Sequence, residues 1–296
     1  MTKVRPIDDQ DAVAVVDRLS AAAAAMREAP NRRGSVSMID GRGSLLFTGD
    51  LHDNPTNLSK VVRCSRIARE TDAHIVLHEL IHGERLQQGL DLSYRMLVKV
   101  ASLVLEHPGR VHVLLANHEL AQMEGHSVSK GGGCMTTLFD LGLRAVFEEE
   151  ADLVASAIGE FVRALPLAAR TENGVLCSHS LPGPMMMDRF DTGILDRELE
   201  ADDYAPMEGS AWMMVWGRGH AESQVEMLAE EWGISLFCLG HAYVESGIGI
   251  GGPRTILLNS DHDQAMVLPI DLGIPAPTVE SAVFDAVPLA SVEVHG

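Results

Sequence analysis

Short polar runs that can bind metal ions follow five apolar segments of this chain. Asp50 and His52 come two residues apart, directly after the apolar run 45–48 and Gly49. The other four runs are His78-Glu79, Asn117-His118-Glu119, Ser178-His179 and Gly240-His241. In an open α/β sheet, ligands gather at the carboxyl ends of the strands. We therefore expect these side chains to converge on one site.

The residue types in these runs suit transition metals. Histidine nitrogen and carboxylate oxygen favour Mn, Fe or Zn over Ca. Two ions roughly 3.5–4 Å apart need a shared carboxylate and further ligands from several strands. The pattern therefore predicts a two-metal centre of hydrolytic type.

The first half of the chain reads as a parallel sheet. Strands are expected at 45–48, 75–77 and 111–115, with amphipathic helices at 56–71 and 92–106 between them. This alternation is typical of βαβ units. An amphipathic helix is expected near 8–28, and the turn 40–43 predicts a hairpin joining 36–39 to 45–48.

After Pro166 short strands dominate, which predicts a second sheet closing as a sandwich against the first. They are expected at 167–170, 174–177, 235–239, 254–258 and 264–270. The predicted fold class is α/β, with two mixed sheets flanked by helices. We expect a helical segment at 1–34, a core domain at 35–273 and a tail at 274–296.

The composition and net charge of the chain argue against several classes of function. The chain has 296 residues and a net charge of −19, which argues against nucleic-acid or anionic-membrane partners. No apolar run approaches the roughly 20 residues of a membrane span, and residues 1–10 lack a signal-peptide core. The four cysteines lie far apart, which disfavours disulfides or a thiolate zinc site. A cytoplasmic enzyme is expected.

Five motifs in order resemble a known family. GDLHD, HELIHG, ANHE, SHSLPG and GHAYVESG are similar to the motifs of calcineurin-like metallophosphoesterases, closest to the serine/threonine phosphoprotein phosphatase branch. The resemblance covers about residues 44–270. It implies a two-sheet sandwich, and metal-dependent hydrolysis of a phosphomonoester in a phosphorylated small molecule or a phosphoprotein.

The resemblance also implies roles for residues. Asp50 and His52 would bind the first of two divalent metal ions, and Asn117, His179 and His241 the second. Manganese is the first expectation, with iron or zinc as alternatives. His118 would protonate the leaving alkoxide, and Glu119 is the second catalytic residue expected.

The second motif departs from the family pattern. The bridging carboxylate is expected at Glu79, because a bridge needs two acceptor oxygens. Alignment on the final glycine of the motif points instead to His78. The arginine that grips phosphate in that branch is absent here, and His82, Arg85 and Arg218 are the candidate substitutes.

Two other functions compete with this interpretation. The run His78-Glu79-Leu80-Ile81-His82 matches HExxH, the zinc-protease motif, which requires one helix carrying both histidines. The altered second motif also suits a non-catalytic relative that binds a phosphorylated ligand. The retained His118 and second-metal ligands favour an enzyme.

Overall fold

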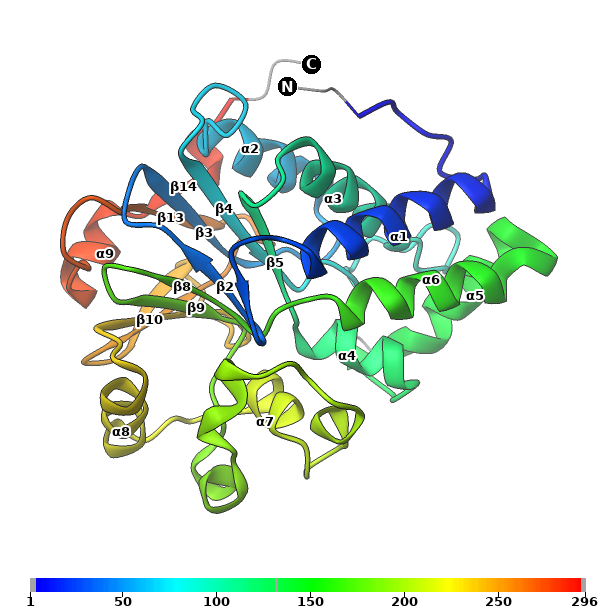
Figure 1. The fold of residues 1–296 in the computed structure, drawn as a ribbon. Helices are drawn as coiled ribbons and strands as arrows, with labels where there is room; N and C mark the ends of the chain where they lie inside the picture. The colour runs from blue at the N-terminus through cyan, green and yellow to red at the C-terminus, as the bar shows by residue number, and fades with distance from the viewer. Residues whose placement is uncertain (1–3, 131–132, 294–296) are drawn as a thin grey trace.

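Two mixed β-sheets with flanking helices form the protein (Figure 1). The structure is a computed structural model that describes residues 4–130 and 133–293. Buried side chains from both sheets, among them Phe47, Val76, Cys177 and Cys238, form a core cluster between them. The α/β sandwich expected from the sequence is therefore confirmed.

The five-stranded sheet carries the first three polar runs. Its order is β14 (Val287–Pro288), β13 (Met266–Asp271), β3 (Ser44–Asp50), β4 (Ala73–His78) and β5 (Val111–Leu114). Strands β3, β4 and β5 are parallel. Helices α2 (Pro55–Cys64) and α3 (Tyr94–Glu106) lie in the connections between them. All three polar runs therefore emerge at the same edge.

The seven-stranded sheet carries the other two runs. Its order is β1 (Arg32–Arg33), β2 (Val36–Ile39), β8 (Ala168–Thr171), β9 (Val175–Ser178), β10 (Leu236–Leu239), β12 (Thr255–Leu258) and β11 (Ile248–Gly252). Strands β9 and β10 are parallel neighbours, with Ser178 opposite Leu239. The residues that follow them, His179 and His241, therefore leave the sheet side by side.

The remaining helices cover the sheets or the site. They are α1 (Ala12–Arg27), α4 (Asn117–Glu124), α5 (Met135–Phe147), α6 (Ala151–Arg163), α7 (Ser210–Trp216), α8 (Glu222–Trp232) and α9 (Val279–Asp285). Figure 1 shows α1, α3, α5 and α6 gathered on one side of the sheets. A short ribbon pairs β6 (Ser129–Lys130) with β7 (Gly133–Cys134). Short 3₁₀ helices occupy Glu148–Glu150, Pro184–Arg189, Thr192–Asp196, Ala201–Tyr204 and Leu289–Ser291.

Two strands lie in a different sheet from the one expected. The hairpin predicted across 36–48 is wrong: β2 pairs in parallel with β8, and β3 pairs with β4 and β13. Gly43 has φ +78°, and a Cβ there would lie 1.9 Å from the Asp72 carbonyl oxygen, so the chain turns between the sheets at a point that only glycine fits. Strand β13, expected in the second sheet, belongs to the first because it pairs with β3.

The end segments pack onto the core. Helix α1 contacts α3 and α6. The stretch expected as a tail contributes, over its described part, helix α9 and the edge strand β14, which pairs with β13. Within residues 4–130 and 133–293, none of the helices combines the length and apolar character that a bilayer crossing needs.

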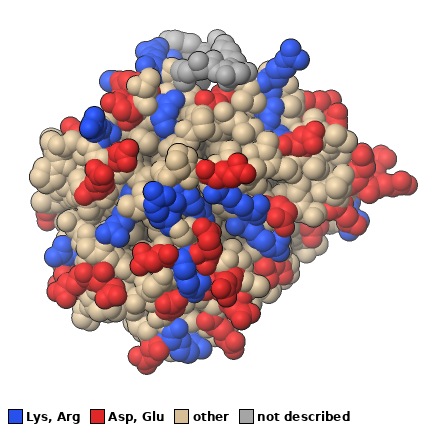
Figure 2. All heavy atoms as spheres, viewed as in Figure 1, with Lys and Arg blue, Asp and Glu red and all other residues tan. Residues whose placement is uncertain are grey.

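Acidic and basic side chains are intermixed on the face shown in Figure 2. Arg27 and Arg163 both pair with Glu160 at 3.3 Å. Arg197 pairs with Asp191 at 2.9 Å and with Asp203 at 2.7 Å. These arginines therefore have local counter-charges rather than forming one broad basic surface.

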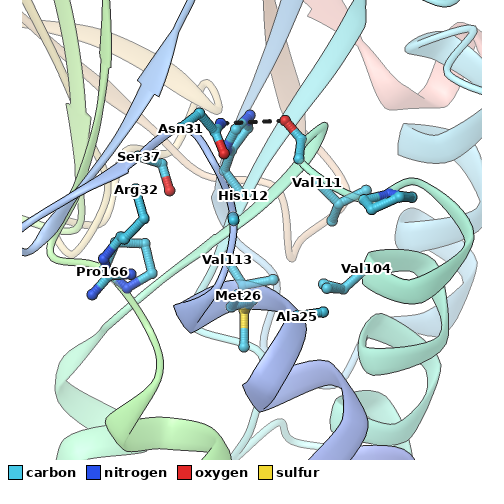
Figure 3. A pocket seen from close by; sticks show the side chains of 13 residues that line it. Ala25, Met26, Asn31, Arg32, Ser37, Val104, Val111, His112, Val113 and Pro166 are labelled. Atoms are coloured by element: carbon cyan, nitrogen blue, oxygen red, sulfur yellow. Dashed lines mark hydrogen bonds between the residues drawn. The ribbon is translucent and has the colours of Figure 1, made fainter.

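His112 on β5 is a buried histidine outside the candidate site. Its Nε2 lies 3.0 Å from Nδ1 of His74 on β4. It also lines a cavity of about 20 Å³, with Met26, Asn31 and Val104, next to helices α1 and α3 (Figure 3). None of the candidate metal ligands lines that cavity. Burial lowers the pKa of His112 to about 3.

We predict that His112 makes the fold sensitive to acid. In the unfolded chain the imidazole titrates near the ordinary histidine pKa of 6.5. Between that pH and about 3, the unfolded state binds a proton that the folded state does not, so the free energy of unfolding falls as pH falls. Urea unfolding between pH 7 and pH 4 should show a shallower decline for His112→Gln, by up to about 1.4 kcal/mol per pH unit. Parallel curves for the two proteins would contradict this.

Candidate metal centre

The candidate ligands converge at the carboxyl ends of five strands. Asp50 is the last residue of β3, and His78 the last of β4; Asn117 opens α4 after β5. His179 follows β9, and His241 follows β10 one residue after Gly240. Apart from His52, which is partly exposed, the set is buried in the described structure.

Asp50 is bound tightly to the segment that carries His241. Its two carboxylate oxygens accept the backbone N–H of His241 at 2.9 and 3.1 Å. A Cβ on Gly240 would lie 2.2 Å from Asp50 Oδ1 and 2.2 Å from Cε1 of His78. Only glycine therefore lets β10 approach closely enough to bring His241 to the site.

Glu79 lies between two sets of histidines. Its Oε2 is 3.9 Å from His52 Nε2 and 3.6 Å from His179 Nε2. Its Oε1 is 3.5 Å from His118 Nε2. The carboxylate therefore faces both halves of the site, as a shared ligand must.

His78 lies behind His179 and limits what that ring can do. His78 Nε2 is 2.9 Å from the carbonyl oxygen of Thr48, which can only accept, so this nitrogen carries the proton. Burial lowers the pKa of His78 to about 4, so the ring is neutral at pH 7 and its Nδ1 can only accept. That Nδ1 lies 3.1 Å from His179 Nδ1.

His179 is surrounded by more acceptors than it has protons to give. Its Nδ1 faces the lone pair of His78, and its Nε2 lies 2.7 Å from the amide oxygen of Asn117. Burial, followed by the neighbouring histidines, lowers the pKa of His179 well below its usual range, so the ring has one N–H. One proton cannot satisfy both contacts. A cation at the unsatisfied side removes the repulsion, so this donor set fits a bound metal.

The charges of the site also favour a cation. Burial raises the pKa of Asp50 to about 7, and lowers the pKa of His241 to about 3. A nearby cation would favour the ionised form of the Asp50 carboxyl and would meet the lone pairs of the neutral imidazoles.

Three groups of side chains bring ligand atoms within 4.8 Å of one another. The groups are Asp50, His78 and His179; His52, Glu79 and His118; and Glu79, His179 and His241. Glu79 and His179 each belong to two groups. The geometry therefore offers more than one set of possible metal ligands, although Asp50 and His52, expected on the same ion, fall in different groups.

Several of these residues have an unusual backbone conformation. His52, Glu79 and His241 have φ of 39°, 48° and 64°. Non-glycine residues in this left-handed region cost roughly 1–3 kcal/mol each and persist only where the surroundings impose the conformation. The backbone N–H groups of Leu51 and His52 donate to the Glu79 carbonyl oxygen at 3.0 and 2.9 Å, which joins the loops after β3 and β4.

The hydrogen bonds that the structure shows for the Glu119 side chain go to backbone N–H groups and not to the His118 ring. Its Oε1 accepts the N–H groups of Leu80 and Ile81 at 2.7 and 3.2 Å, and the residue is 1% exposed. It therefore fixes the segment that carries Glu79. His118 itself lies with Nε2 toward Glu79.

The three residues expected to bind phosphate differ in their exposure and contacts. His82 is fully buried, and its Nδ1 lies 2.7 Å from Asp91 Oδ2, so it cannot contact a substrate from solvent. Arg85 is exposed and lines a cavity of about 490 Å³ together with His52 and Tyr243. Arg218 is exposed on the other flank, and its guanidinium donates to the His241 carbonyl oxygen at 3.0 Å.

The HExxH interpretation is wrong. Strand β4 ends at His78, and residues 79–82 form a loop rather than a helix. His78 and His82 face different partners, Thr48 and Asp91. They therefore cannot form the one-face pair of a zinc protease.

Asp91 and Ser93 were missed by the sequence analysis. Asp91 Oδ1 accepts the N–H of Ser93 at 2.8 Å, and Ser93 Oγ accepts the N–H of His82 at 3.1 Å. Both lie just before α3 in a stretch without a motif, so only their burial beside His82 reveals them.

The site agrees with a sequence family. Residues 43–245 match the profile described as calcineurin-like phosphoesterase, which is more than half of the chain. This chain belongs to the calcineurin-like phosphoesterase family. The match includes every candidate ligand from Asp50 to His241.

Solved phosphatase structures share the fold at low identity. A Saccharomyces cerevisiae protein serine/threonine phosphatase, described as similar to human phosphatase PP5, is 12% identical with a TM-score of 0.65, covering 90% of this chain and 89% of that one. A cold-active protein-tyrosine phosphatase from a psychrophilic Shewanella is 14% identical with a TM-score of 0.53, covering 86% and 84%. No curated protein gives a significant match to this sequence.

Metal content tests which residue bridges the two halves of this phosphoesterase site. After equilibration with Mn²⁺ and removal of free metal, elemental analysis should find about two equivalents per wild-type chain. Glu79→Ala should fall below one equivalent, because its carboxylate faces both halves. His78→Ala should keep two at saturating metal and lose affinity by about 10–100-fold, as expected for a residue behind a ligand.

His74→Ala, at the opposite end of β4, is the matched control and should bind as wild type does. Retention of two equivalents by Glu79→Ala, with loss of both from His78→Ala, would show that His78 is the bridge instead.

Proposed function

We propose that this protein is a metal-dependent phosphatase that hydrolyses phosphomonoesters. The observation that carries the proposal is the crowding of lone pairs around His179, which has one N–H for His78 Nδ1 on one side and the Asn117 amide oxygen on the other. Such a donor set needs a cation, and Glu79 faces both halves of it. Membership in the phosphoesterase family supplies the reaction class.

Each residue then has a role. Asp50, His52 and Glu79 would hold one divalent ion, and Glu79, Asn117, His179 and His241 the other, with manganese preferred and iron or zinc as alternatives. Two such ions supply a lowered pKa for water and offset the charge of the phosphoryl group. His118, 8% exposed and with Nε2 on the Glu79 side, would give its proton to the leaving alkoxide oxygen.

The surface around His52 supports access for a substrate. The cavity of about 490 Å³ is lined by Arg85, Tyr243 and His262 as well as His52. Arg85 on this flank and Arg218 on the His241 flank would bind the phosphate or the groups attached to it. The cavity also carries Glu84, Asp261 and Asp263, so the phosphorylated molecule, small metabolite or protein side chain, would meet both signs of charge.

Hydrolysis of phenyl phosphate in the presence of Mn²⁺ tests the function. We expect turnover by the wild type, and a loss of kcat by about 10²–10⁴-fold in His118→Ala, because general acid catalysis contributes that much to expulsion of a poor leaving group. Steady-state release of phosphate is the measurement.

His126→Ala, just beyond the end of α4, is the matched control and should keep wild-type kcat. A wild-type protein that binds two Mn²⁺ and inorganic phosphate without hydrolysing any phosphomonoester would favour the non-catalytic phospho-ligand binder and overturn the enzyme proposal.

A further inference from the structure

A closed set of hydrogen bonds lies buried behind His118. His82 Nδ1 is 2.7 Å from Asp91 Oδ2, and the other oxygen of Asp91 accepts the N–H of Ser93. Ser93 Oγ accepts the backbone N–H of His82 at 3.1 Å, which closes the set. All three residues are at most 2% exposed. The arrangement therefore fixes both the position and the rotation of the His82 ring.

The tautomer of His82 follows from these contacts. An ionised carboxylate can only accept hydrogen bonds, so the contact with Asp91 Oδ2 means that His82 Nδ1 carries the proton and donates it. The other nitrogen, Nε2, is then an acceptor. It is fully buried and has no hydrogen-bond partner among the described residues. A buried polar atom left in this state is unfavourable, because it has lost its hydrogen bonds to water without gaining one in the protein.

The His82 ring faces His118. The two ring centroids are 5.4 Å apart, with the planes inclined by 51°. His118 has Nε2 toward Glu79, and its Nδ1 is buried. Glu119 holds Leu80 and Ile81, so the backbone leading to His82 is fixed as well.

We propose that His82, held by Asp91, is a positioning residue for His118. Its Nε2 lone pair accepts the Nδ1–H of His118, which orients that ring so that Nε2–H faces the leaving group. Hydrogen bonds of this kind are often long in the absence of substrate and shorten when it binds. The inference rests on the proposed phosphatase function and adds to it the two residues that direct the proton.

The proton count of the step is balanced without any transfer to His82. The P–O bond to the leaving group breaks, the leaving oxygen takes the proton from His118 Nε2, and the oxygen of water bonds to phosphorus while one proton of that water passes to solvent. His118 keeps its Nδ1–H, still donated to His82, and regains a proton at Nε2 from solvent. Asp91 stabilises the more polarised His118–His82 contact while His118 is an imidazolium.

The test compares two substrates that need protonation to different degrees. Phenyl phosphate releases a weakly acidic phenol and depends on His118, whereas 4-nitrophenyl phosphate releases a far more acidic phenol and depends on it little. We expect His82→Leu to lower kcat for phenyl phosphate by about 10–100-fold, with less than a threefold loss for 4-nitrophenyl phosphate. KM and bound Mn²⁺ should be unchanged. Asp91→Asn should show the same selectivity to a smaller extent.

His82→Gln keeps an acceptor at similar reach and should recover part of the lost kcat, which a purely structural role would not predict. The double variant His82→Leu/His118→Ala should be no slower on phenyl phosphate than His118→Ala alone, because both changes remove one function. His74→Leu, a change of the same type on β4 in a histidine whose Nδ1 is also paired, is the matched control.

Equal losses on both substrates, additive losses in the double variant, or loss of bound Mn²⁺ would overturn the positioning role. If His82→Leu does not fold, His82→Gln and Asp91→Asn carry the same comparison. A wild type that hydrolyses neither substrate defeats the proposed function itself. A wild type that is active and sensitive to His118→Ala, but indifferent to His82 and Asp91, defeats only this inference.

Discussion

His179 has one proton for two acceptor atoms, the Nδ1 of His78 and the amide oxygen of Asn117. His78 is committed to the Thr48 carbonyl group and offers a lone pair on one side, and Asn117 offers its amide oxygen on the other. Because both contacts are buried, water cannot resolve the conflict. A bound cation would resolve it, so this donor set fits a metal ion. Asp50 and Glu79 each belong to a group of possible ligands that also contains His179.

The sandwich holds those acceptors together against their mutual repulsion. Parallel strands β3, β4 and β5 of one sheet, and β9 and β10 of the other, end at a common edge. The strained backbone at His52, Glu79 and His241 is held by bonds between neighbouring loops, such as those from Leu51 and His52 to the Glu79 carbonyl oxygen. Gly240 permits the close approach of β10 to Asp50. Stability of the two sheets is thus used to maintain a locally unfavourable arrangement.

The loop after β4 combines two departures from the family pattern that have related physical consequences. Glu79 has a longer side chain than aspartate and reaches toward both halves of the site. Three residues later, His82 is buried against Asp91 and beside His118. The same loop thus contributes the carboxylate between the candidate metal-binding groups and the ring behind the proposed proton donor. Glu119 accepts two backbone N–H groups of this loop and so fixes its conformation, which accounts for a buried acid at this position.

The sequence alone determined the sandwich class, the helix and strand alternation of residues 45–120 and the polar residues that meet at the strand ends. The spacing of apolar residues along the chain indicates the strands, and ligands gather at the carboxyl ends of such strands. Both can therefore be predicted from the sequence. Tertiary structure alone decided that β2 leaves β3 for the other sheet, that His82 is buried rather than exposed to phosphate, and that Asp91 supports it. The same is true of the tautomer of His78, which depends on one carbonyl group 30 residues away. These outcomes depend on which segments pack against each other across the sandwich, and on which donor and acceptor atoms meet there. Residues close together in the sequence do not determine such contacts.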